Sequence, residues 1–200
     1  ARAGLAPGDL DFLIYTGVGR GCVEPAMAST IQPALGAKNA TCFDVLDACA
    51  SWLRALHIAH CFLKTGTYRR GMIVNCEAGF RSHVQWTFAS PDELEDRFAA
   101  FTIGEAATAT VVSNETANDD FYFTFRTFGE HSHRCIIPQP SFPDFFPDRI
   151  AAHFVPGRFF ARSRELFPLV TELIVSTWNA DSYLSAGTYG VAFGHEASEK

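Results

Sequence analysis

An alternation of apolar, strand-like runs with helical segments is the feature that most restricts the fold of this chain. The pattern predicts strands over residues 11–18, 41–46 and 71–76, separated by helices over 25–35 and 49–64. Parallel strands need crossover connections, and a helix is the usual one. We therefore expect an α/β fold in which helices cover a parallel sheet.

The remaining residues are expected to extend this arrangement. A small-residue turn and a strand are predicted over 103–112, followed by another strand over 121–127, antiparallel to it. Residues 136–157 are rich in Pro and Phe and have no clear period, so we expect a loop or linker there. A helix over 158–179 and a final strand over 189–193 complete the prediction.

Composition narrows the class of protein. The chain has 200 residues, 48% of them hydrophobic, and can bury a core. A net charge of −6 without any basic run gives no indication of nucleic-acid binding. No apolar run approaches the ~20 residues of a membrane helix, and the chain does not open with a signal-peptide pattern, so we expect a cytoplasmic protein that does not bind membranes. The six cysteines form no C-x-x-C pair and are interpreted as reduced thiols.

Cys49 is the strongest candidate for a reactive group. It comes after the strand-like run 42–46 and opens the helical segment 49–64. Free N–H groups and the macrodipole at a helix N-terminus favour the thiolate, which is the nucleophilic form. The alternative is a buried, unreactive cysteine, which is the commoner use of this residue.

His195 is the candidate partner of this thiol, because it follows the predicted strand 189–193. Ligands of open α/β sheets bind at the carboxyl ends of the strands, so His195 and Cys49 can meet in one site. A cysteine with a histidine is the minimum for acyl transfer. A hydrogen-bonded structural histidine is the alternative.

Several motifs in this order resemble a known family. They are the segment 3–14 (AGLAPGDLDFLI), Pro25-Ala26-Met27-Ala28, the segment 43–50 (FDVLDACA), Leu63-Lys64-Thr65-Gly66, the segment 103–109 (IGEAATA) and Gly194-His195-Glu196-Ala197-Ser198. Together they are similar to the β-ketoacyl-acyl-carrier-protein synthase III enzymes of fatty acid biosynthesis, in the thiolase superfamily. The resemblance implies an α/β, thiolase-like layered α-β-α fold with a mixed sheet. Both termini look like cuts through a larger protein, so we expect a fragment with an incomplete fold.

The resemblance also implies a domain arrangement and a reaction. Residues 1–135 would form part of the N-terminal half, 136–157 a linker, and 158–200 the start of the C-terminal half. Cys49 would accept an acyl group and His195 would hydrogen-bond the incoming thioester in a Claisen condensation. The family's Asn and its Gly-rich loop, which lie C-terminal to the His motif, are not in this sequence.

Partners follow from the same resemblance. Acyl-CoA and acyl carrier protein would be substrates, without a further cofactor, and a homodimer is implied. Lys200 stands where the family often has an Arg that meets the carrier, although a terminal Lys is more often simply solvated. No metal is expected, because the spacing of His131, His133 and Cys135 fits no common zinc pattern.

Glu24 departs from the synthase III pattern and raises an alternative. A glutamate before Pro-Ala-x-Ala resembles enzymes that join two fatty acyl thioesters head to head, in which a glutamate contributed across the dimer helps to form the carbanion without decarboxylation. A carboxylate in an apolar channel can serve as a base. Glu24 can also be a plain surface residue of a loop. For the protein as a whole, a non-catalytic thiolase-like subunit is a further alternative.

Overall fold

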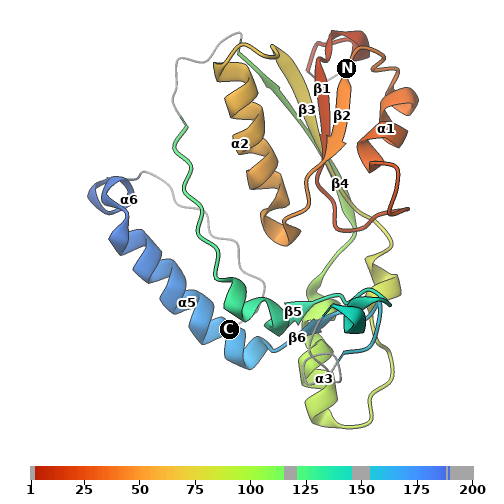
Figure 1. Ribbon diagram of the computed structural model, residues 1–200, viewed down its shortest axis with the longest axis vertical. Helices are drawn as coiled ribbons and strands as arrows, with labels where there is room; N and C mark the ends of the chain where they lie inside the picture. Colours follow the sequence, from red (N-terminus) through yellow and green to blue (C-terminus); the bar gives the residue numbers. More distant parts are fainter. Residues whose placement is uncertain (1–2, 115–120, 146–153, 188, 190–200) are drawn as a thin grey trace. The chain divides into compact units, whose positions relative to one another are not determined.

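The computed structural model describes residues 3–114, 121–145, 154–187 and 189. These residues group into two compact units (Figure 1). One unit comprises Ala1–Phe80 and Glu105–Thr124, and the other comprises Arg81–Gly104 and Phe125–Lys200. The segment Arg81–Gly104 thus groups with the C-terminal residues, and the assignment of thiolase halves with a linker over 136–157 stays a prediction.

The first unit is built on a four-stranded mixed sheet of strand order β2-β1-β3-β4. The strands are β1 (Phe12–Tyr15), β2 (Thr41–Asp44), β3 (Arg70–Glu77) and β4 (Ala106–Ser113). β1 is parallel to both β2 and β3, whereas β4 runs antiparallel to β3. The predicted mixed sheet with a parallel core is therefore confirmed.

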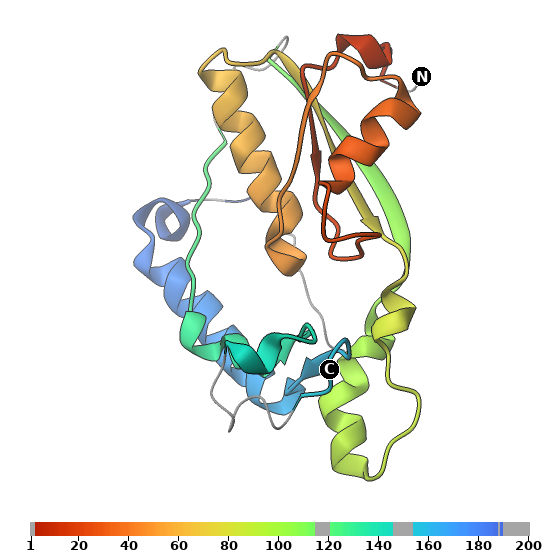
Figure 2. The ribbon, with the colours of Figure 1, turned by 45° about the vertical axis from the view of Figure 1, so that its right-hand side comes forward.

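Helices α1 (Met27–Leu35) and α2 (Ser51–Lys64) cover opposite faces of this sheet (Figures 1 and 2). Successive side chains of a strand point to opposite faces, so β1 supplies both cores. Leu13 packs with Ala28 on the α1 side, and Ile14 packs with Ala55 and Ala59 on the α2 side. All of these side chains are fully buried. A strand buried on both faces explains why β1 is apolar throughout.

The second unit contains a charged helix, a short two-stranded sheet and a long C-terminal helix. Its elements are α3 (Pro91–Phe98), β5 (Cys135–Ile136) paired antiparallel with β6 (Phe160–Ala161), α5 (Ser163–Ala180) and α6 (Ser182–Ala186). The Arg97 guanidinium lies 4.9 Å from the centre of the Phe160 ring and is almost fully buried. Burial lowers the pKa of Arg97 from its usual value.

Short 3₁₀ turns link these elements. They span Pro7–Asp9, Ala48–Ala50, Phe80–His83, Ala99–Thr102, Gly129–Arg134 and Phe142–Asp144. None of the described helices has the length and apolar character needed to cross a lipid bilayer.

One predicted strand is wrong, and two short helices, α3 and α6, were not predicted. Residues 121–127 form no strand, and the rings of Phe121 and Phe123 lie against α2 instead. The Phe123 ring stacks on His57 at 4.8 Å between centroids, and Phe121 meets His60 edge to face. α3 was missed because it is short and mostly polar. The predicted strand 189–193 lies outside the described residues apart from Tyr189.

Candidate active site

Cys49 lies in a 3₁₀ turn between β2 and α2, and its side chain is exposed. The predicted delivery of the cysteine from strand to helix is confirmed, but α2 itself begins two residues later, at Ser51. All six cysteines are free thiols. Cys49 is therefore an accessible thiol at the entrance to a helix.

The backbone before Cys49 has an unusual conformation. Ala48 has a φ of +45°, in the left-handed region that residues with a Cβ rarely adopt. Such a conformation costs on the order of 1–3 kcal/mol and persists only where neighbouring contacts enforce it. Here the Ser51 hydroxyl donates to the Ala48 carbonyl at 2.7 Å and accepts from the Asp47 N–H at 2.7 Å.

Further contacts close the same turn. The Ala50 N–H donates to the Asp47 carbonyl at 3.0 Å, and the Asp47 carboxylate pairs with the Arg54 guanidinium at 2.9 Å. Ser51 is only 1% exposed, so its two hydrogen bonds are sheltered from water. Ser51 was not among the predicted site residues, although a serine at the start of a helix is a recognisable signal.

Glu24 lies on the same edge of the sheet as Cys49. β1 and β2 are parallel, and their last residues, Tyr15 and Asp44, are partners in the register. The chain leaves β1 into the loop that carries Glu24, and it leaves β2 toward Cys49. Carboxyl ends of parallel strands share one edge, so both candidate residues emerge there. Glu24 itself is exposed.

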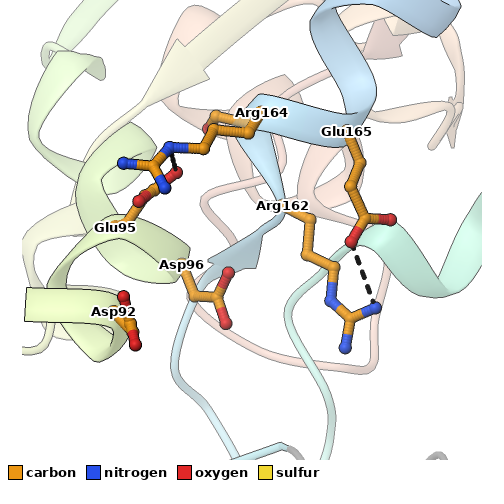
Figure 3. Close-up of a pocket in the computed structure, with 7 residues that line it drawn as sticks. Asp92, Glu95, Asp96, Arg162, Arg164 and Glu165 are labelled. Atoms are coloured by element: carbon orange, nitrogen blue, oxygen red, sulfur yellow. Dashed lines mark hydrogen bonds and ion pairs between the residues drawn. The ribbon is translucent and has the colours of Figure 1, made fainter.

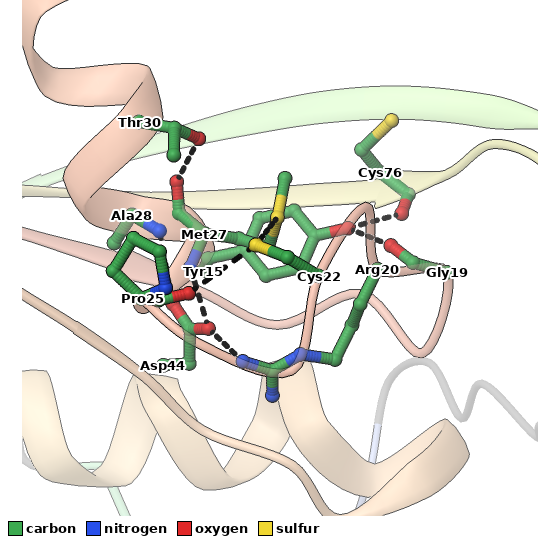
Figure 4. Close-up of polar contacts among 10 residues, drawn as sticks. All are labelled: Tyr15, Gly19, Arg20, Cys22, Pro25, Met27, Ala28, Thr30, Asp44 and Cys76. Carbon is green, nitrogen blue, oxygen red and sulfur yellow. Dashed lines mark hydrogen bonds and ion pairs between the residues drawn. The ribbon is translucent and has the colours of Figure 1, made fainter.

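Two side chains, those of Tyr15 and Glu77, tie the beginning of the Glu24 loop to the sheet, and Figure 4 shows the contacts of Tyr15. The Tyr15 hydroxyl lies within hydrogen-bond distance of the Gly19 carbonyl and of the Cys76 carbonyl, the latter at 2.8 Å. Burial, followed by the nearby Cys76 and Glu77, raises the pKa of Tyr15 to about 12. The Glu77 carboxylate accepts from the Val18 N–H at 2.8 Å and from the Gly19 N–H at 2.9 Å.

Asp44 ties the end of the same loop to β2. Its carboxylate accepts from the N–H groups of Met27 (2.8 Å) and Ala28 (2.9 Å), and it pairs with the Arg20 guanidinium. The N-cap residue Ala26 offers no side-chain acceptor to α1, so Asp44 supplies one from another strand. The sequence analysis did not single out Asp44, although a carboxylate ending an apolar strand was a usable signal.

His195 and Lys200 lie outside the described residues. Their approach to Cys49 and to a carrier protein stays a prediction. The described residues contain no group of three or more His, Cys, Asp or Glu side chains placed to hold a metal ion. His131 and His133 both lie in the 3₁₀ turn Gly129–Arg134 of the second unit.

The second unit has a charged pocket of about 370 Å³ beside α3 (Figure 3). Arg164 forms an ion pair with Glu95, and Arg162 pairs with Glu165 at 3.5 Å. Since both arginines are neutralised within the pocket, we assign no ligand to it.

Comparison with known proteins finds a family whose sequence pattern includes the Cys49 turn. Residues 43–129, which include Cys49, match the family model of 3-oxoacyl-[acyl-carrier-protein (ACP)] synthase III. The chain is thus similar to the β-ketoacyl synthase III enzymes over this stretch. β-Ketoacyl-[acyl-carrier-protein] synthase III of Streptococcus sanguinis is 28% identical over 131 residues, which are 66% of this chain and 37% of that protein. The enzyme of the same name from Sphingopyxis alaskensis is 31% identical over 118 residues, which are 59% of this chain and 34% of that protein.

Solved structures show the thiolase-like fold of this synthase III-like chain. A cysteine-to-serine variant of Xanthomonas campestris OleA with bound lauric acid and lauroyl-CoA superposes with a TM-score of 0.74 at 21% identity, covering 93% of this chain and 53% of that one. A histidine-to-alanine variant of OleA gives a TM-score of 0.51 at 26% identity over 56% of this chain and 35% of that one. The chain thus spans about a third of the length of these curated relatives and about half of the OleA chain with bound lauroyl-CoA.

Proposed function

We propose that the protein forms a carbon–carbon bond between acyl thioesters, with Cys49 as the acyl-accepting nucleophile. The observation that carries the proposal is the exposed Cys49 in a constrained strand-to-helix turn, within the stretch that matches the synthase III family. Acyl-CoA or an acyl carrier protein would supply the acyl group, and a homodimer would be the working form. We expect the protein to act in the cytoplasm, where thiols stay reduced.

The reaction would proceed in two acyl transfers. The Cys49 thiolate attacks the carbonyl carbon of the acyl thioester, a new C–S bond forms, and the carrier thiolate leaves and takes up a proton. A carbanion on a second thioester then attacks the acyl-cysteine carbonyl. The C–C bond forms as the bond to Cys49 breaks, which returns the thiolate. Backbone N–H groups near the turn would stabilise the oxyanion, and His195 would hydrogen-bond the incoming thioester.

The source of the carbanion separates two forms of this function. In the synthase III form, a malonyl thioester loses carbon dioxide. In the alternative form, a base removes a proton from a second fatty acyl thioester, and Glu24, contributed across the dimer, would help to form the carbanion. The glutamate directly before Pro25 favours this form, and so does the likeness to OleA, a variant of which has been crystallised with lauroyl-CoA.

Mass spectrometry of the full-length protein after incubation with lauroyl-CoA tests the proposal. We expect one acyl group on the peptide that contains Cys49, and none in a Cys49→Ser variant. Cys61→Ser is the matched control, because Cys61 is also exposed but lies near the end of α2. Absence of the adduct on the parent protein would contradict catalysis and favour a non-catalytic subunit. Where the acyl-cysteine does form, release of labelled carbon dioxide from malonyl-CoA would identify the decarboxylating form.

A further inference from the structure

Helix α2 begins two residues after Cys49, so the place of this helix on the sheet sets the place of the thiol. The helix lies along one face of the four-stranded sheet (Figure 1). Ala55 and Ala59, both fully buried, press its middle against the sheet. Alanine side chains form only shallow ridges, so they do little to lock a helix lengthwise. Longer side chains must therefore fix where α2 stands along the sheet.

Aromatic rings anchor the C-terminal half of α2. Phe62 meets Phe12 of β1 at 5.5 Å and Phe43 of β2 at 6.2 Å between centroids, in both cases edge to face. A rise of about 1.5 Å per residue places Phe62 roughly 16 Å along the helix from Ser51. This anchor is therefore remote from the first turn of the helix and from Cys49.

Trp52 supplies a contact at the other end of the helix. Its indole N–H donates to the hydroxyl of Thr110 on β4, at 3.1 Å. Trp52 is the second residue of α2 and packs against the buried cluster that contains Ile73, the partner of Thr110 across the β3–β4 pair. A half-buried indole N–H needs an acceptor, which makes the contact directional. The first turn of α2 is thus tied to a strand that comes 58 positions later in the sequence.

This tie bears on the proposed reaction because the thiol moves with the first turn of the helix. Two residues separate Cys49 from Trp52, and one of them is the buried Ser51, which hydrogen-bonds back to Ala48. A displacement of the Trp52 ring is therefore passed on to the Cys49 turn. Acyl transfer is sensitive to displacements of about 1 Å between reacting groups. A small alkylating reagent approaches an exposed thiol from many directions and is less demanding.

We propose that Trp52, through its hydrogen bond to Thr110, is a positioning residue that holds Cys49 in the orientation needed to accept the acyl group from its thioester. This inference rests on the proposed acyl-cysteine chemistry. The role of the two side chains is to place the turn and not to take part in bond making. The tie lies within one chain and acts on acyl loading, so it holds for either source of the carbanion.

Thr110→Val and Thr110→Ser separate the hydrogen bond from packing. Valine keeps the shape of threonine without the hydroxyl, and serine keeps the hydroxyl without the methyl group. In the full-length protein, the single-turnover rate of Cys49 acylation at saturating lauroyl-CoA should fall at least about fivefold in Thr110→Val and stay within about twofold of the parent in Thr110→Ser. The half-saturating concentration should not change, because substrate binding is not altered. Trp52→Phe, which removes the N–H, should behave as Thr110→Val does.

Tyr68→Phe is the matched control. The Tyr68 hydroxyl donates to the Thr41 hydroxyl at 3.2 Å, which is again a bond between an aromatic side chain and a threonine of the sheet. Thr41 is the first residue of β2, at the end of that strand away from Cys49. Tyr68→Phe should therefore acylate within about twofold of the parent rate. The double variant Trp52→Phe with Thr110→Val should be no slower than the slower single variant, because both changes remove one bond.

Two further measurements do not depend on acyl transfer. Alkylation of Cys49 by iodoacetamide, followed on its own peptide, should stay within about twofold of the parent rate in every variant, because the thiol stays exposed. Hydrogen–deuterium exchange over residues 46–54 should be faster in Thr110→Val than in Thr110→Ser, because only the valine variant frees the first turn of α2.

Four results would each overturn the inference. They are equal acylation rates in the two Thr110 variants, an additive double variant, a similar loss in Tyr68→Phe, and a loss of alkylation equal to the loss of acylation. If the parent forms no acyl-cysteine, the proposed function fails instead. The exchange rates then decide the positioning role alone, and equal exchange in the two Thr110 variants overturns it.

Discussion

The hydroxyl of Ser51 donates a hydrogen bond to the carbonyl of Ala48, 2.7 Å away, and so holds the one residue of the Cys49 turn that has a left-handed backbone. The same oxygen accepts from the Asp47 N–H. One buried side chain therefore links Ser51, which follows Cys49, to the two residues that precede Cys49.

Replacing Ser51 by alanine should lower the free energy of unfolding by about 1–3 kcal/mol, because the Asp47 N–H and the Ala48 carbonyl lose a buried partner. Acylation of Cys49 should slow as well, since the turn is no longer held. Urea unfolding and the rate of acyl-cysteine formation measure the two effects. Ser176→Ala removes a comparable hydroxyl-to-carbonyl bond from exposed α5 and should change neither quantity appreciably. An unchanged acylation rate in Ser51→Ala would contradict the role assigned to Ser51.

Glycine and valine at position 48 should change the stability of the fold in opposite directions. Glycine carries no penalty at a φ of +45°, so Ala48→Gly should leave the melting temperature unchanged or raise it. Ala48→Val should destabilise by about 1–3 kcal/mol, because a β-branched side chain is strained in this region. Differential scanning calorimetry measures both. Ala50→Val is the control, since Ala50 has an ordinary φ of −83° in the same turn. Equal effects of valine at positions 48 and 50 would show that backbone strain is not the cause.

The parallel core of the fold was predictable from the sequence because its signals are local. β1 is buried on both faces, and such a strand is a continuous apolar run with turn residues beyond it. The segment 121–127 carries a similar local signal, an alternation of aromatic and polar residues. Its Phe123 ring nevertheless packs on His57 of α2, and only the three-dimensional structure reveals that partner.

The candidate site also has a part that the sequence predicts and a part that only the fold reveals. The place of Cys49 between a strand and a helix was predictable, because both signals lie within ten residues of sequence. The contacts of Asp44 were not, since Arg20 and Met27 lie 24 and 17 positions away from it. Sequence shows a carboxylate at the end of a strand, but the fold decides which donors it meets.

Gly71 should tolerate no side chain. A Cβ added there would collide with the ring of Phe12, its partner across the β1–β3 pair. That ring cannot move freely, because it is fully buried and packs against Phe62 and Tyr68 at 5.5 and 5.4 Å between centroids. Gly71→Ala should therefore destabilise by about 1–3 kcal/mol, as overpacked cores do. Gly104→Ala is the control, because nothing lies within 4 Å of its added Cβ. Equal unfolding midpoints for the two variants would contradict this packing argument.

Asp11 should contribute stability that depends on pH. The N–H of Arg69 donates to its carboxylate and is the main cause that holds the pKa of Asp11 below its ordinary value of 3.8, with the Arg70 N–H adding to it. Because the folded chain binds the proton more weakly than the unfolded chain, this stability is present above pH 3.8 and is lost as the pH falls through the folded pKa. Asp11→Asn should therefore unfold at lower urea concentration than the parent at pH 7, and the difference should shrink below the pH of 3.8 at which the unfolded carboxyl titrates. A difference that stays the same at both pH values would mean that Asp11 acts through the shape of its side chain and not through its charge.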